Sequence, residues 1–295
     1  MGVHQVSNAA DNNQKLIFGK LDAIRDVPTL PAIALRALEI SNGDDSSAKE
    51  LAVFIGRDQA LTTRLLALTN STAYRLAGKV ATVDRAVIIL GFAKVRSIVL
   101  SASTSNIFAG ASDCLDRGRL WRHSIATATA ARLLAKGIPG SDPETAYIAG
   151  LLHEVGIIIM DRYFHEALRA AVQIAHAQRT TIDKALRDLI GLDQFRIGNY
   201  LAKRWKLPDA LSQAIGLHNN PPLSDVNAQV ISLVHVASMI ADACKINYEP
   251  YAAAKPISAN AIQLLGITPV KIKAAADELN NQRASMDEFA ELCSR

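Results

Sequence analysis

A histidine and a glutamate stand side by side within an otherwise apolar stretch of the chain. His153 and Glu154 interrupt the segment 146–160, AYIAGLLHEVGIIIM, in which most of the other side chains are hydrophobic. A helix that is apolar nearly all round is normally buried. A buried ionisable pair is costly unless it is hydrogen-bonded, paired with charge or bound to a metal. The pair therefore needs partners from elsewhere in the chain.

Two further histidines are candidates for these partners. His123 lies upstream in LWRHSIATATAARLL, and His218 lies downstream in AIGLHNNPP. Three imidazoles and one carboxylate suit Zn, Fe, Mn or Ni, and a catalytic metal site also needs an open position for water. Clustered ionisable groups also occur in purely structural networks. The residue types therefore leave a metal site and a structural polar cluster both open.

Helices are the elements expected to position these residues. The hydrophobic residues recur with a period near 3.6 along the whole chain, and no segment alternates with a period of 2, which predicts an all-α, multi-helical fold. Neighbouring residues of a helix point ~100° apart, so both members of the doublet reach one metal only if their helix crosses the site at an angle. Gly156 costs ~1 kcal/mol relative to Ala in a helix, which indicates a close crossing or a break just after the doublet.

The chain divides into two predicted helical lobes with flanking segments. Residues 103–116 are small and polar, and we interpret them as the boundary between the lobes. The predicted organisation is a disordered tail at 1–14, an N-terminal helical lobe at 15–105, a second helical lobe at 115–250 and C-terminal helices at 256–295.

Composition narrows the class of protein. Of 295 residues, 49% are hydrophobic and 5% aromatic, which favours closely packed helices. The net charge of +4 comes from interspersed charges, whereas nucleic-acid binding needs clustered Lys and Arg, so we do not expect nucleic acid as a partner. The three cysteines are widely spaced and form no CxxC, which is typical of reduced thiols.

Neither a membrane span nor a secretory signal is predicted. The N-terminal residues are polar and include no apolar h-region. Charged residues or the His–Glu doublet interrupt the longest apolar runs, so none reaches the ~20 residues that a membrane span needs. We expect a cytoplasmic protein.

Several motifs resemble known families. GLLHEVG, with WRHS upstream and His218 downstream, resembles the HD superfamily of metal-dependent phosphohydrolases. LPAIALRALEI, DQALTTRLLALTNSTAYR and VDRAVIILGFAKVRSIVL resemble the HDOD family of HD-related bacterial signalling domains, and the resemblance covers about 16–243. It implies an N-terminal helical lobe packed on an HD-like helical lobe.

The chain departs from the active HD pattern at several positions. The doublet is His153–Glu154 where active HD enzymes have His–Asp, and Ile157 stands where the HD-GYP relatives have a lysine. The resemblance puts the last metal ligand, an Asp, at Ser238, although Asp242 follows one turn later. HDOD proteins commonly lack the full ligand set, and this chain is similar to them in that respect.

Two functions follow from this reading. The favoured one is a non-catalytic signal-transduction or regulatory module, with no residue assigned to catalysis, which binds a partner protein or a small nucleotide-type ligand through a degenerate HD-type pocket. The alternative is a metal-dependent phosphohydrolase, or phosphodiesterase, in which Glu154 and Asp242 replace the usual carboxylates. The expected ligands of a divalent metal are His123, His153, Glu154 and His218, with Asp242 as a further candidate.

Overall fold

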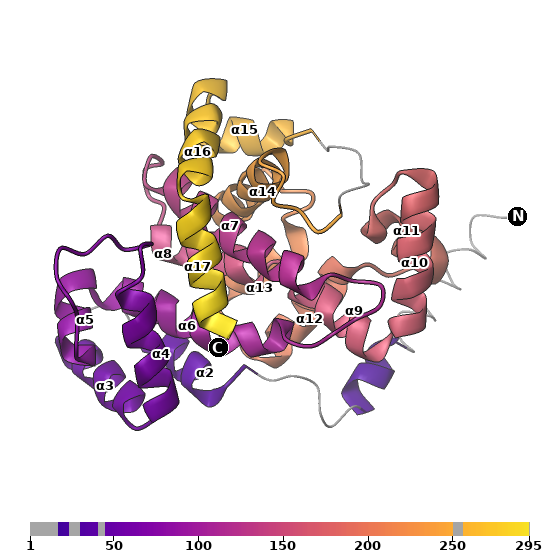
Figure 1. Cartoon of the computed structure of the whole chain (residues 1–295). Helices are drawn as coiled ribbons and strands as arrows, with labels where there is room; N and C mark the ends of the chain where they lie inside the picture. Colours follow the sequence, from indigo (N-terminus) through magenta and orange to yellow (C-terminus); the bar gives the residue numbers. More distant parts are fainter. Residues whose placement is uncertain (1–16, 24–29, 41–44, 250–255, 295) are drawn as a thin grey trace, which may run out of the picture.

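The described part of the chain is entirely helical apart from turns and connections (Figure 1). A computed structural model describes residues 17–23, 30–40, 45–249 and 256–294, and no strand occurs in these ranges. The all-α prediction is confirmed, whereas the tail predicted at 1–14 lies outside the described residues. No helix in the described ranges is both long and apolar enough to cross a lipid bilayer.

Four helices of the first half gather around α6 (Phe92–Phe108). Two of them begin at side-chain caps: Asp58 accepts a hydrogen bond from the amide of Leu61, and Thr82 accepts one from the amide of Arg85. Each such cap satisfies an amide that the first turn leaves without a partner. The other helices of this group are α2 (Ala32–Glu39), α3 (Asp45–Gly56), α4 (Gln59–Thr69) and α5 (Val83–Leu90).

Helix α6 continues through residues 103–108, where the sequence suggested that the lobe boundary had already begun. Its hydroxyl side chains find acceptors, which makes their burial tolerable. Thr104 Oγ1 donates to the carbonyl of Leu100 at 2.7 Å, and Ser105 Oγ donates to that of Cys293 at 2.6 Å. The small polar composition of this segment therefore reflects close helix packing, and only residues 109–116 connect α6 to α7.

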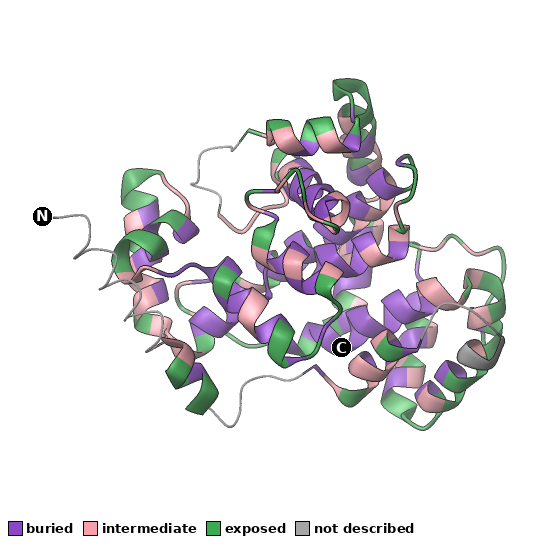
Figure 2. Ribbon diagram, turned by 180° about the vertical axis from the view of Figure 1, so that it is seen from behind, coloured by how far each residue is buried: buried purple, intermediate pink, exposed green. Residues whose placement is uncertain are grey.

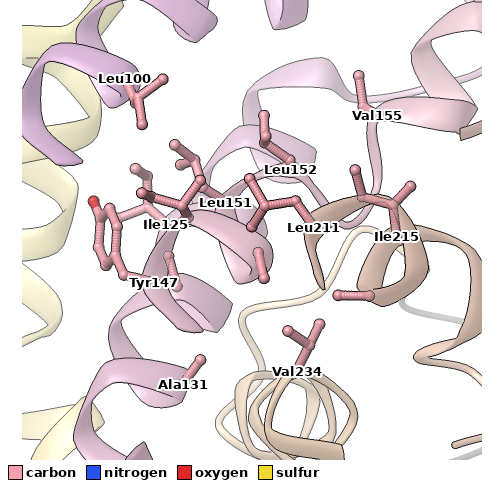
Figure 3. Packing of buried hydrophobic residues seen from close by; sticks show 14 of the residues in the cluster. Leu100, Ile125, Ala131, Tyr147, Leu151, Leu152, Val155, Leu211, Ile215 and Val234 are labelled. Carbon is pink, nitrogen blue, oxygen red and sulfur yellow. The ribbon is translucent and has the colours of Figure 1, made fainter. Parts of the chain in front are cut away.

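The second group of helices is built around α7 (Arg117–Ala135), α8 (Pro143–Leu152) and α14 (Ala228–Ala243). The small-residue run of α7 lets α8 approach closely, because a Cβ added at Gly150 would lie 2.9 Å from the Cα of Ala128. Figure 3 shows Ile125, Leu151, Leu211 and Val234 meeting in this core. The remaining helices of the group are α9 (Val155–Tyr163), α10 (His165–Gln178), α11 (Ile182–Ile190), α12 (Gln194–Arg204) and α13 (Asp209–Leu217).

The last of the three C-terminal helices connects the two groups. The three are α15 (Ala259–Leu265), α16 (Pro269–Asn281) and α17 (Arg283–Ser294). α17 packs against α4 and α6 on one side and α7 on the other. Trp121 of α7 donates its indole N–H to the carbonyl of Ala290 at 3.1 Å. Figure 2 shows the buried residues concentrated where these elements meet, with exposed residues on the outer helices.

The connection between α6 and α7 is fixed by one buried carboxylate. Asp161, near the end of α9, accepts hydrogen bonds from Ser112 Oγ at 2.8 Å and from Arg117 Nε at 2.7 Å. His165 points Nδ1 at Asp161 Oδ1 (3.0 Å) and Nε2 at Asp113 Oδ1 (2.8 Å). Hydrogen bonding to Asp161 in the first place, and to Asp113, raises the pKa of His165. The imidazolium is therefore the form that this connection favours.

We expect the stabilising contribution of His165 to decrease with rising pH. Its folded pKa lies above the value of an unfolded histidine, so the contribution is fully present below about pH 6.5 and is lost as pH rises through the folded pKa. The stability advantage of the wild type over His165→Asn should be larger at pH 6 than at pH 9, measured by urea unfolding. Arg169 and Asp113 also face this histidine and remain in both proteins. An equal advantage at both pH values would contradict the prediction.

Candidate functional site

The His–Glu doublet lies at a break between two helices. α8 ends with His153 as its C-cap, and Glu154, with φ −101° and ψ 15°, precedes the first residue of α9. The sequence indicated a close crossing or a break just after the doublet; in the structure the helix breaks at the doublet itself, and the close crossing is at Gly156. The new direction of α9 lets Gly156 rest directly on the backbone of α12, where a side chain would collide with Gln194. The break also lets both members of the doublet face the same space, which a continuous helix does not favour.

The structure brings the three predicted histidines together. His123, His153 and His218 are buried, and the ring centroids lie 5.2 Å apart for His123 and His153 and 4.9 Å apart for His153 and His218. One nitrogen from each of His123 and His153 and one carboxylate oxygen of Glu154 all lie within 4.8 Å of one another. Segments that are far apart in the sequence thus converge on one small volume.

The backbone fixes the same tautomer in all three imidazoles. Nδ1 of His123 lies 2.7 Å from the carbonyl oxygen of Ile246, Nδ1 of His153 lies 2.7 Å from that of Gly150, and Nδ1 of His218 lies 2.9 Å from that of Ala214. A carbonyl oxygen only accepts, so each Nδ1 carries the hydrogen and each neutral ring keeps a lone pair on Nε2. Metal-binding histidines are oriented in this way.

His153 is the most constrained member of the cluster. Burial, reinforced by the neighbouring His218 and His123, holds its pKa well below the usual range, so the ring is neutral. Its Nε2 atom has no hydrogen-bond partner in the described part of the chain, and Glu154 Oε1 lies 3.6 Å away. A buried polar atom without a partner is rare in folded proteins. A metal ion or a ligand N–H would satisfy it.

The carboxylate of Glu154 is oriented by two residues that the sequence analysis did not identify. Gln194, the first residue of α12, donates its amide N–H to Oε2. Tyr248 forms a hydrogen bond with the same carboxylate, and its pKa is raised well above the usual value by burial and then by the charge of Glu154. Tyr248 is thus a neutral donor. No sequence pattern points to either residue, because the burial of Gln194 is visible only in the structure.

The two positions on α14 lie on opposite sides of His123. Ser238 Oγ lies 3.4 Å from Nε2, the nitrogen with the lone pair, and Thr127 Oγ1 lies 3.5 Å from the same atom. Asp242 Oδ1 lies 3.6 Å from Nδ1, which already faces the carbonyl of Ile246. A hydroxyl therefore occupies the position that the HD resemblance gives to the last acidic ligand. Asp242, the further candidate ligand, lies at the other edge of the ring.

A fourth histidine nearby has a different role. His235 of α14 places Nδ1 2.8 Å from the carbonyl oxygen of His218 and accepts a hydrogen bond from the amide of Ser258 at Nε2, at 2.9 Å. Both ring nitrogens are thus engaged with backbone groups. The residue supports the segment that carries His218 and joins it to the start of α15.

A cavity of about 360 Å³ opens beside the cluster. His123, Glu154 and His218 line its inner end, and Phe195 and Ile240 add apolar surface. Its lining includes four carboxylates but no Lys or Arg among the described residues, so the pocket is negative unless a cation is bound. The four are Glu154, Asp183, Asp242 and Glu249. The imidazoles of His123 and His153, the carboxylate of Glu154 and the negative surroundings fit a single divalent ion, and the ring of His218 lies next to that of His153.

A helical lobe centred on a histidine cluster around a His–acid doublet, packed on a second helical lobe, places the protein in the HD-like class. The HDOD domain family matches residues 27–221, and the chain belongs to this family. The membership predicted from the sequence motifs is confirmed.

Solved structures share the fold. An HDOD domain protein of unknown function from Geobacter sulfurreducens superposes with a TM-score of 0.81 at 25% identity, covering 96% of this chain and 99% of the other. A candidate signal-transduction protein from Marinobacter aquaeolei superposes with a TM-score of 0.75 at 22% identity, covering 92% of this chain and 60% of the other. A candidate phosphohydrolase from Shewanella amazonensis superposes with a TM-score of 0.72 at 24% identity, covering 92% of this chain and 97% of the other. The last two identities are low enough that the likeness shows the fold alone.

One sequence relative is longer than this chain. An uncharacterised protein from Treponema pallidum is 28% identical over 229 residues, which are 76% of this chain but 44% of the relative. The chain thus spans less than half the length of that relative.

Proposed function

We propose that the protein is a non-catalytic regulatory module of signal transduction whose HD-like pocket binds a small ligand at a single divalent ion. One observation carries this proposal: the group of residues spaced to hold an ion, His123, His153 and Glu154, includes a single carboxylate. Gln194 and Tyr248 already engage this carboxylate, and Ser238 replaces the last acidic ligand. The family match supports a signalling role, and the candidate signal-transduction protein from Marinobacter aquaeolei shares the fold.

The chain's own residues have separate roles in this proposal. His123 and His153 would hold the ion through Nε2, with His218 as the further expected ligand, and the carbonyls behind the three rings fix their orientation. Glu154 supplies the negative ligand, and Gln194 and Tyr248 fix its orientation. A bound divalent ion would polarise an oxygen atom of the ligand. It would also offset the carboxylates of the pocket, so a nucleotide-type ligand would enter only together with the ion.

The second candidate is a metal-dependent phosphohydrolase; the Shewanella amazonensis protein is named as a candidate phosphohydrolase. The shared fold and the group formed by His123, His153 and Glu154 support it. Efficient hydrolysis additionally needs carboxylates that hold a second metal or orient the attacking water. Asp242 is the nearest further acid on α14, and it approaches the Nδ1 edge of His123. This geometry favours binding over turnover.

We expect one metal ion per chain and no phosphodiester hydrolysis. The protein is reconstituted separately with Mn, Fe, Zn and Ni, metal content is measured by elemental analysis, and activity is assayed with bis-p-nitrophenyl phosphate. His153→Ala should weaken metal binding about a hundredfold or more, because second-shell changes alone cost about 10–100-fold. His176→Ala, at an exposed position of α10, is the matched control and should bind metal normally.

Two outcomes would contradict this. Metal-dependent turnover that His153→Ala abolishes would establish the phosphohydrolase instead. Absence of any bound metal, with equal melting temperatures with and without each ion, would make the histidine cluster a purely structural network. Circular dichroism of His153→Ala distinguishes loss of metal binding from loss of the fold.

A further inference from the structure

A second cavity lies behind the segment that forms one wall of the histidine pocket. Ile246 directs its carbonyl oxygen toward Nδ1 of His123, at 2.7 Å, and also lines this second cavity. Asn247 lines both cavities. The second cavity, of about 370 Å³, lies between α7 and the start of α17, which pack against each other (Figure 1). Its volume falls within the range of small-molecule sites, about 300–1,000 Å³.

The charged side chains of this groove are mainly cationic. Arg119, Arg122, Lys245 and Arg283 line it, together with the two carboxylates of Asp287 and Glu291. The histidine pocket has the opposite character, with four carboxylates and no Lys or Arg among its described lining residues. One short segment of chain therefore separates a negative pocket from a positive groove.

The cations are only partly neutralised within the protein. Arg122 lies 3.6 Å from Asp287, and Arg283 donates one N–H to the carbonyl of Cys244. Within the described ranges, the side chains of Arg119 and Lys245 make no hydrogen bond or ion pair. Arg119 and Arg122 are three residues apart on α7, so they share a face of the helix. Like charges at this spacing repel each other and destabilise the helix. A bound anion would remove that repulsion.

The backbone places one of these cations, Lys245, in a tight turn. Lys245 has a φ of 60°, an uncommon left-handed conformation for a residue with a side chain. The turn that it forms follows α14, where the amide of Lys245 donates to the carbonyl of Asp242 at 2.9 Å. Guanidinium groups bind phosphate through paired N–H donors, and lysine adds a compact charge. The groove offers three guanidinium groups and one lysine ammonium group.

We propose that this groove binds the phosphoryl group of a small phosphorylated molecule through Arg119, Arg122, Lys245 and Arg283. This site goes beyond the regulatory role proposed above and does not depend on a metal in the histidine pocket. In the absence of metal, phosphate is attracted to the groove and repelled by the carboxylates of that pocket.

The test uses inorganic pyrophosphate and the full chain, by isothermal titration calorimetry at low ionic strength with EDTA present. We expect saturable binding that weakens as salt is added. Arg119→Gln should weaken it about tenfold, since a hydrogen bond to a charged group contributes on that scale. Asp287→Asn should strengthen binding severalfold, because it removes a negative charge from the groove. Arg196→Gln, at an exposed arginine of α12 outside the groove, is the matched control and should leave affinity unchanged.

Three results would overturn the proposal. The first is no pyrophosphate binding at low ionic strength. The second is equal affinity in wild type, Arg119→Gln and Asp287→Asn. The third is binding that His153→Ala abolishes and Arg119→Gln leaves intact, which would place the anion in the histidine pocket. Failure of the metal experiments above would leave these results unaffected.

Discussion

Replacing Gly156 with alanine should lower the free energy of unfolding by about 3 kcal/mol, the upper part of the range for overpacked sites. A Cβ at this position would overlap the backbone carbonyl oxygen of Gln194 and lie 2.8 Å from the backbone nitrogen of Gly198. Both obstacles belong to the backbone of α12, so no side-chain rotation removes the clash. α9 and α12 would have to separate. Glu154 and Gln194, which are hydrogen-bonded across the same contact, would separate with them.

The prediction is checked by urea unfolding of the Gly156→Ala variant, followed by far-UV circular dichroism. Gly56→Ala is the matched control, because Gly56 ends α3 and has no heavy atom within 4 Å of an added Cβ. This control should leave stability unchanged or increase it by up to about 1 kcal/mol. A loss below about 1 kcal/mol in Gly156→Ala would show that the two helices do not touch as the structure has them. Metal affinity should fall in the same variant.

Replacing Glu144 with leucine should cost about 3–5 kcal/mol, as expected when one member of a buried ion pair is removed. Glu144 joins the two groups of helices: it accepts a hydrogen bond from Ser97 of α6 at 2.7 Å and pairs with Arg132 of α7 at 2.5 Å. The guanidinium of Arg132 also lies over the ring of Tyr147, 3.7 Å from its centre. Without the carboxylate, a nearly buried guanidinium would lose its counter-charge.

A double variant separates the cost of the unpaired charge from the loss of packing. Arg132→Met together with Glu144→Leu removes both charges while keeping apolar volume, and should recover most of the lost stability. Asp277→Ala serves as the control, because its pair with Lys273 is exposed and should change stability by less than about 1 kcal/mol. Urea unfolding of the four proteins gives the comparison. If the double variant is as unstable as Glu144→Leu alone, the unpaired charge of Arg132 is not the cause of the lost stability.

The convergence of the histidines was accessible from sequence because burial makes an ionisable residue conspicuous. His153 and Glu154 stand out within an apolar helix, and His123 and His218 were then the histidines that the HD resemblance marked as partners. The all-helical fold followed from a single hydrophobic period along the chain. Both inferences depend on local patterns that side-chain burial imposes directly.

The orientation of the site was not accessible in the same way. Gly156 indicated a close crossing or a break, but the element that it meets, α12, could not be inferred, because the contact joins segments 38 residues or more apart. Tyr248 reaches Glu154 from a turn without any periodic pattern. Ser238 and Asp242 are one helical turn apart, yet they lie on opposite edges of the same imidazole. Such differences of a few ångströms arise from packing between helices, and sequence spacing does not encode them.

Helix α9 connects the two charged centres of this half of the molecule. Glu154 precedes its first residue, and Asp161, which holds the connection between α6 and α7, lies near its last. Nine helical residues span only about 13 Å, and we expect so short a helix to move as a rigid unit. The backbone contact between Gly156 and α12 fixes the end of this helix that lies close to the histidines. A ligand that displaces Glu154 would therefore also displace Asp161, and with it the hydrogen bonds that hold the connection between α6 and α7.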